Sequence, residues 1–256
     1  MEGSNIGHKI VFAYGEQESN PMPSEWVQNM EDFKRLHEGW EVHLLTIENA
    51  PEEYLPLYQH SKILWAQAVR FDHVAKHGGF YSDLDVRFFE RLPALNGAEL
   101  VLAVELHGKV TDAFFGAREN HPLMCEARDR VVDWAKARAI DGADISACDI
   151  LTEASVTMFT ELAQDHTGFG FDYQSQIHMD ERAFAGNFHP ENGVGILPFE
   201  ALCRHSVANW FGWHMCHGTW RPKNAAGAVD MDSQALVYSK PADVIGESLE
   251  ADQSCG

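Results

Sequence analysis

Two aspartates in an otherwise apolar segment are the side chains best placed to do chemistry. The segment Gly78–Phe88, GGFYSDLDVRF, carries Asp83 and Asp85 with one leucine between them. Its aromatic and apolar residues predict a strand over 80–89, and alternate side chains of a strand point the same way, about 7 Å apart. Neighbouring carboxylates repel each other unless a hard divalent cation lies beside them. The pair therefore indicates either a site for Mg²⁺ or Mn²⁺ with bound phosphate, or two loop aspartates that face water.

Alternating strands and helices would position this pair. Apolar runs predict strands at 8–15, 40–47, 98–106 and 193–198. Helical patterns cover 23–37, the second half of 51–79, 121–138 and the latter part of 145–164. One face of the second helix is formed by Gln67, Arg70, Phe71 and Val74, and Gly78 follows as its C-cap glycine. This alternation predicts an α/β fold with a mostly parallel central sheet.

The composition argues against several classes of partner. The 256 residues carry a net charge of −20, which disfavours binding of nucleic acid or anionic membrane through a general basic surface. Any phosphate would be held locally, by one or two basic groups or by a cation. We expect a cytoplasmic protein, because no signal peptide and no apolar run of about 20 residues is visible.

The pattern of elements changes near the C-terminus. Residues 1–226 are predicted to form one domain. From about Gly227 the periodicity ends, and acidic residues dominate the remaining segment. Residues 227–256 are therefore predicted to be an acidic, flexible tail.

The stretch Ala66–Val86, AQAVRFDHVAKHGGFYSDLDV, resembles the glycosyltransferases with a sugar-binding DxD motif. That family includes α-mannosyltransferases, bacterial capsule enzymes and glucosylating toxins. Its pattern joins Ser-Asp and Arg-Tyr, across an apolar helix, to Gly-Gly-apolar-Tyr and Asp-x-Asp. The matching residues here are Arg70, Phe71, Gly78, Gly79, Tyr81, Asp83 and Asp85. Gln67 stands where the family usually has aspartate.

Later blocks follow in the family's order, so that the resemblance covers residues 8 to 222. DAFFGARENHPLM, from Asp112 to Met124, is similar to the family's Asn-x-apolar-apolar-small-Ala…His-Pro block, with Asp112 in place of the asparagine. VGILPFEAL is similar to the late apolar strand. HMCHGTW, from His214 to Trp220, resembles the closing His-His-Trp-x-Gly-Ser-Trp.

The resemblance implies a GT-A-like, Rossmann-type fold that binds a nucleotide sugar. It implies a metal-dependent enzyme of polysaccharide biosynthesis that moves a hexose from a UDP- or GDP-sugar to a glycan or other hydroxyl acceptor, with retention. Asp85 would bind Mn²⁺ or Mg²⁺, assisted by Asp83, which would also contact the sugar or ribose. Arg70 would contact the sugar–diphosphate region.

Further site residues are implied in the same way. His214 would complete the metal shell, with His217 as its rival if the register shifts by three residues. The remaining donor contacts would come from Tyr14 near the base, Gln67 and Asp112 near the sugar, and Trp220 over the diphosphate.

Other interpretations stay open at this point. Haloacid-dehalogenase-type phosphohydrolases also have an Asp-x-Asp-x-Val motif after a strand, and a non-catalytic nucleotide-sugar binding module would share the binding residues. Arg70 alone could form an ordinary helix-face ion pair, and Tyr14, His214 and Trp220 could be core residues. A zinc site is a further alternative, formed by Cys203, His205, His214, Cys216 and His217.

Overall fold

The computed structural model describes residues 6–15, 21–89, 91–92, 97–104, 109–141, 149–150, 153–168, 170, 188–189, 193–197 and 212–214. The chain divides into two units, Met1–His217 and Gly218–Gly256, and all described residues belong to the first. The predicted tail at 227–256 and the predicted boundary at residue 226 lie outside the described residues and stay predictions.

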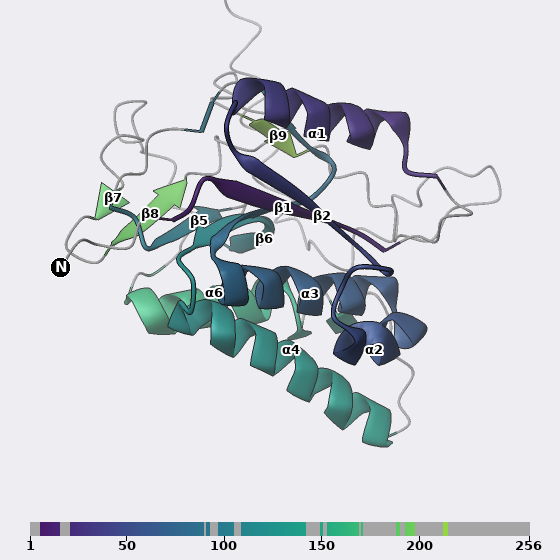
Figure 1. Ribbon diagram of the computed structural model, residues 1–256. Helices are drawn as coiled ribbons and strands as arrows, with labels where there is room; N and C mark the ends of the chain where they lie inside the picture. Colours follow the sequence, from purple (N-terminus) through teal and green to yellow (C-terminus); the bar gives the residue numbers. More distant parts are fainter. Residues whose placement is uncertain are drawn as a thin grey trace, which may run out of the picture. The chain divides into compact units, whose positions relative to one another are not determined.

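A seven-stranded sheet runs through the described unit in the order β2-β1-β3-β6-β5-β8-β7 (Figure 1). The strands are β1 (Lys9–Tyr14), β2 (Glu41–Thr46), β3 (Gly79–Ser82), β5 (Leu100–Val104), β6 (Val110–Ala117), β7 (Phe188–His189) and β8 (Val194–Leu197). β1 pairs in parallel with β2 and β3, and β5 pairs in parallel with β8. β6 runs antiparallel to both β3 and β5, and β7 runs antiparallel to β8. Five of these seven strands therefore point the same way, which confirms the predicted α/β fold with a mostly parallel sheet.

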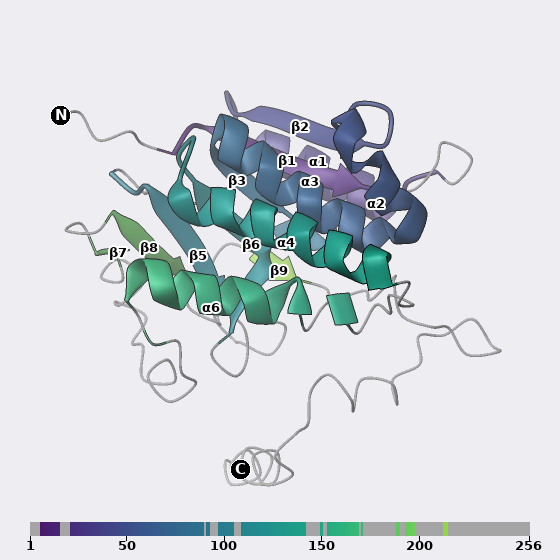
Figure 2. The ribbon, with the colours of Figure 1, turned by 90° about the horizontal axis from the view of Figure 1, so that it is seen from below.

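Helices cover both faces of the sheet. They are α1 (Ser24–Leu36), α2 (Leu55–His60) after the short 3-10 helix η1 (Glu52–Tyr54), α3 (Lys62–His77), α4 (Pro122–Asp141) and α6 (Val156–Thr167). α1 lies on one face, whereas α3, α4 and α6 lie side by side on the other (Figures 1 and 2). Each face has its own aromatic core, around Phe33 and Phe114 under α1 and around Trp65, Phe71 and Phe159 under α3. None of the helices in the described part of the chain combines the length and apolar character that membrane crossing requires.

Both ends of α3 are capped, and the cap at Gly78 confirms the prediction from the sequence. Ser61 caps the first turn by accepting a hydrogen bond from the Leu64 amide. Gly78 ends the helix with a φ of 63°, a left-handed conformation that favours glycine, and its amide donates to the Val74 carbonyl at 2.8 Å. This cap directs the chain straight into β3.

The predicted continuous strand over 80–89 is wrong. β3 ends at Ser82, and β4 (Val86–Phe88) begins only after a turn at Asp83–Asp85, closed by the Val86 amide donating to the Asp83 carbonyl at 3.1 Å. β4 belongs to a second sheet, in which it pairs antiparallel with β9 (Gly212–His214). The chain must turn here because β3 and β4 lie in different sheets, and the two aspartates therefore lie on the turn.

Candidate active site

The turn that carries the two aspartates follows the carboxyl end of β3. Because β6 runs opposite to β3, its first residues lie at the same edge of the sheet, and the Asp83 amide donates to the Ala113 carbonyl at 2.8 Å. From α1, the buried amide of Asn29 donates to the Leu84 carbonyl at 2.9 Å. The turn is thus held by a strand of the sheet and by a helix, at the edge where open α/β sheets bind ligands.

Arg70 connects the turn to β6. Its guanidinium lies 3.3 Å from the Asp83 carboxylate and 3.5 Å from that of Asp112, and it donates to the Asp112 carbonyl at 2.8 Å. It also lies 4.5 Å from the centre of the Tyr81 ring, a cation–π contact. The side chain is buried, so the structure brings Arg70, Asp83 and Asp112 together as one charged cluster.

Gln67 and Asp112, which lie 45 residues apart in the sequence, contact each other directly. The Gln67 Nε2 atom donates to Asp112 Oδ2 at 2.5 Å and to Ser155 Oγ at 3.0 Å. The Ser155 hydroxyl itself donates to the same Asp112 oxygen. The Asp112 carboxylate fixes the orientation of the Gln67 amide, since the opposite orientation would place two acceptor oxygens against each other. Gln67 Oε1 is buried and has no hydrogen-bond partner among the described residues.

The electrostatics of the cluster favour the charged form of Arg70. Burial alone would lower the pKa of Arg70, but the nearby anionic groups, with Asp83 the strongest of them, raise it above its usual value. Burial raises the pKa of the Tyr81 hydroxyl well above its ordinary value, so this hydroxyl stays protonated and donates to Asp83 Oδ1 at 2.5 Å. The Asp83 carboxylate is therefore held by a guanidinium and a phenol among its described neighbours.

The cluster groups several acidic side chains around one basic side chain. Among the described residues, the carboxylates of Asp83, Asp85 and Asp112 act on the guanidinium of Arg70. Among the described residues, no three His, Cys, Asp or Glu side chains are grouped so that they could hold a metal ion. A divalent cation would fit the charge of this site, with Asp85 and further oxygen ligands from a bound phosphate.

The backbone of His214 lies next to this turn. In the pairing of β4 with β9, His214 lies opposite Val86, the residue that directly follows Asp85. The structure describes only the backbone of His214. His217, Trp220 and the cysteines and His205 of the alternative zinc site lie outside the described residues.

Tyr14 ends β1 and is buried, with its ring packed edge-on against Trp26. It lies on the strand next to β3, at the same edge of the sheet. Its predicted contact with a nucleotide base stays a prediction.

Sequence reasoning assigned no role to Ser155, Asn29 or the Tyr81 hydroxyl. A serine directly before a helix usually caps it, but the Ser155 side chain makes no cap hydrogen bond on α6 and bonds to Asp112 and Gln67 instead. Asn29 lies on the buried side of α1, and a polar residue on that side was the one available signal. Tyr81 belongs to the matched motif, and its position two residues before Asp83 suits the contact observed.

Comparisons with known proteins give partial structural matches at low identity. No protein-family model matches the chain, and no curated protein matches it. Three solved structures match it in part: a PaToxG glycosyltransferase (12% identity, TM-score 0.49, 64% of this chain and 70% of that one), the glycosyltransferase GlyE of Streptococcus pneumoniae (13%, 0.36, 59% and 44%), and a transferase with two Cys-to-Ser substitutions (12%, 0.30, 49% and 79%). The α/β architecture described above is consistent with the predicted GT-A-like fold.

Proposed function

We propose that this chain is a metal-dependent glycosyltransferase that moves a hexose from a UDP- or GDP-sugar to a glycan or other hydroxyl acceptor, with retention. The observation that carries the proposal is the grouping of three carboxylates. Asp83, Asp85 and Asp112 lie around Arg70, at the sheet edge where α/β folds bind nucleotides. Carboxylates at such an edge would repel a diphosphate, and a bound divalent cation would offset that repulsion. The resemblance of the DxD motif points to the same chemistry.

The proposed roles follow from the contacts. Asp83 is held by Arg70 and Tyr81, so it is proposed to contact the sugar or ribose and to assist Asp85 with Mn²⁺ or Mg²⁺. Such a cation, when bound, would act as a Lewis acid on the diphosphate leaving group. Arg70 holds the cluster together and adds positive charge beside the diphosphate. His214 and Trp220 keep the roles that the resemblance implies.

Gln67 and Asp112 are proposed to contact the hexose. The buried Gln67 Oε1 is an acceptor that lacks a partner among the described residues, and a sugar hydroxyl could supply the missing donor. A donor sugar with a hydroxyl group at that place would be preferred over its deoxy analogue, because the deoxy sugar would leave the buried oxygen unpaired.

A donor screen tests the proposal. The full chain is incubated with Mn²⁺ or Mg²⁺ and a panel of UDP- and GDP-sugars, and released nucleoside diphosphate is measured. Release from one donor is expected, and it should be lost with a chelator and in Asp85→Asn. The matched control Asp165→Asn changes an exposed aspartate on α6 and should retain release.

The other outcomes identify the alternatives. Donor binding by calorimetry without release, in the presence of an acceptor panel, would indicate a non-catalytic binding module. A phosphorylated aspartate trapped at Asp83 would identify a phosphohydrolase. Absence of donor binding even with metal would refute the glycosyltransferase proposal.

A further inference from the structure

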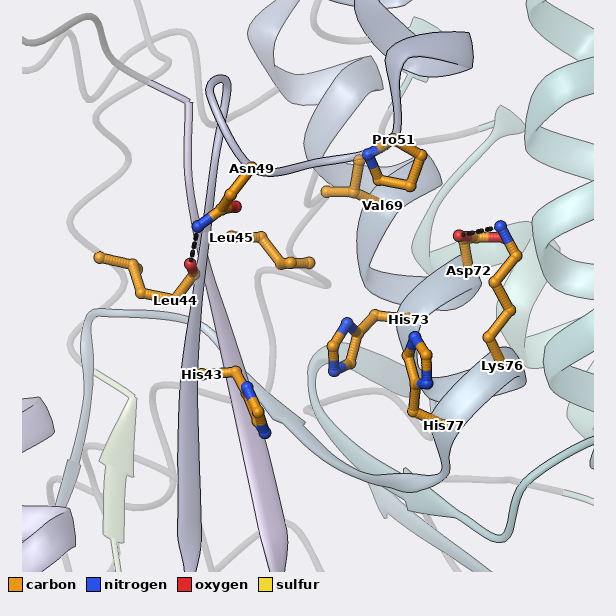
Figure 3. A pocket seen from close by; sticks show the side chains of 10 residues that line it. All are labelled: His43, Leu44, Leu45, Asn49, Pro51, Val69, Asp72, His73, Lys76 and His77. Carbon is orange, nitrogen blue, oxygen red and sulfur yellow. Dashed lines mark hydrogen bonds and ion pairs between the residues drawn. The ribbon is translucent and has the colours of Figure 1, made fainter.

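Three histidines line a cavity that shares no residue with the charged cluster. The cavity has a volume of about 310 Å³ and lies between β2 and α3 (Figure 3). His43 comes from β2, and His73 and His77 come from α3. None of these residues takes part in the function proposed above.

The spacing of the imidazoles suits a metal chelate. His73 and His77 lie four residues apart on one helix, so their side chains are neighbours on its surface. Their ring centres are 4.7 Å apart, and those of His43 and His73 are 5.6 Å apart. Imidazole nitrogens are preferred ligands of Zn²⁺, Cu²⁺ and Ni²⁺, and two histidines at this helical spacing recur in zinc sites.

The protonation state of His73 supports the same ligand class. Burial, together with the facing His77 and His43 and the nearby Lys9, lowers the pKa of His73 to about 4, against an opposite effect of Asp72. His73 is therefore neutral at neutral pH, and its nitrogen can bind a metal without first losing a proton.

An anion fits the cavity less well than a metal ion. The lining ammonium group, that of Lys76, is already paired with Asp72 at 2.9 Å and with Glu53 at 3.4 Å. A phosphate would therefore meet a neutral imidazole at His73 and an ammonium group already held by two carboxylates. A metal ion needs only the lone pairs of the imidazole nitrogens.

We propose that His73 and His77 form a two-histidine site for a borderline transition-metal ion such as Zn²⁺, with water as further ligands. We assign two protein ligands rather than three, because no three His, Cys, Asp or Glu side chains among the described residues are close enough together to hold a metal ion. His43 is exposed, and its Nε2 atom lies 3.3 Å from Glu41 Oε2; turning the ring away from Glu41 would make it a third ligand. This nitrogen site would take Zn²⁺ or Ni²⁺, whereas the carboxylates of the charged cluster suit Mg²⁺ or Mn²⁺.

Calorimetric titration with Zn²⁺ tests the site on the full chain at neutral pH. The Asp85→Asn background removes the proposed carboxylate ligand, so that zinc binding there is not counted. In this background, zinc is expected to bind, and His77→Gln should weaken binding by about tenfold or more. The matched control His60→Gln alters an exposed histidine on α2 and should leave the zinc affinity unchanged.

Cobalt absorption and zinc affinity in the two histidine variants distinguish this site from other metal sites on the chain. Co²⁺ bound in place of zinc should show the absorption of nitrogen ligation, and His73→Gln and His77→Gln should both diminish it. Because His77 is exposed, its replacement should leave the circular dichroism spectrum unchanged. Equal zinc affinity in the Asp85→Asn protein and in its His73→Gln and His77→Gln derivatives would overturn the proposal. A failure of the Asp85→Asn protein to bind zinc would also overturn it. This test does not depend on glycosyltransfer.

Discussion

Replacing Gln67 with methionine tests whether the buried network organises the candidate site. Methionine has nearly the same length and shape as glutamine but cannot donate a hydrogen bond. The change removes the donor to Asp112 Oδ2 and the donor to Ser155 Oγ, and leaves Arg70 and Ser155 as the remaining partners of the Asp112 carboxylate. The fold should persist, because a side chain of similar volume fills the same space.

The magnitude follows from the two lost hydrogen bonds. A hydrogen bond to a charged acceptor contributes about 1.5–3 kcal/mol and one to a neutral hydroxyl about 1 kcal/mol. Removing the buried Gln67 Oε1, which has no partner among the described residues, returns about 1 kcal/mol or more of desolvation cost. The expected loss in the free energy of unfolding is about 2 kcal/mol. For a chain of this size, that corresponds to a fall in Tm of roughly 4–8 °C.

Urea unfolding followed by circular dichroism measures this loss, and Gln28→Met is the matched control. The amide of Gln28 also donates to a carboxylate, that of Asp32 at 3.0 Å, but from an exposed position on α1. The control should change the free energy of unfolding by less than about 0.5 kcal/mol. If Gln67→Met changes stability no more than Gln28→Met does, the network does not stabilise the site and the reasoning fails.

Three further predictions concern pH, the backbone and the turn. The pKa values of His73 and His121 are lowered to about 4, chiefly by burial, whereas the unfolded value is about 6.5. Each histidine should therefore contribute stability above pH 6.5 that is lost as the pH falls toward 4. The expected loss is about 1–2 kcal/mol for each, after allowance for solvent screening. The urea midpoint should fall less between pH 6.5 and 4 in the His73→Gln, His121→Gln double variant than in the unsubstituted protein. An equal fall in both proteins would contradict the lowered pKa values of the two histidines. Gly79→Ala should destabilise the protein by about 1–3 kcal/mol in the same assay, because φ is +99° and the new Cβ would lie 2.8 Å from a backbone oxygen of β1; unchanged stability would show that the close approach relaxes freely. Asn29→Leu should release the Leu84 carbonyl and lower donor turnover about tenfold more than Val27→Leu, an exposed control on the same helix; equal turnover in the two variants would deny Asn29 its positioning role.

Much of the site could not be derived from the sequence because it depends on pairing between distant segments. β6 was not predicted, since Thr111, Asp112 and Gly116 interrupt its apolar run, yet the whole strand is buried between β3 and β5. Its antiparallel insertion places Asp112 against Gln67 and Arg70. No local pattern contains that information, because the contacts join residues more than forty positions apart.

Local interactions, by contrast, were enough to determine several elements from the sequence. The helix at 62–77 follows from one face of regularly spaced residues and a glycine that can adopt positive φ, and the strands at β1, β2 and β5 follow from short apolar runs. The sequence also determined that Asp83 and Asp85 lie close together and that Arg70 shares a face with Gln67. Only the tertiary structure decided that the aspartates lie on a turn and that Gln67 bonds to Asp112. It did so because strand order and sheet membership depend on long-range packing, which residue spacing does not encode.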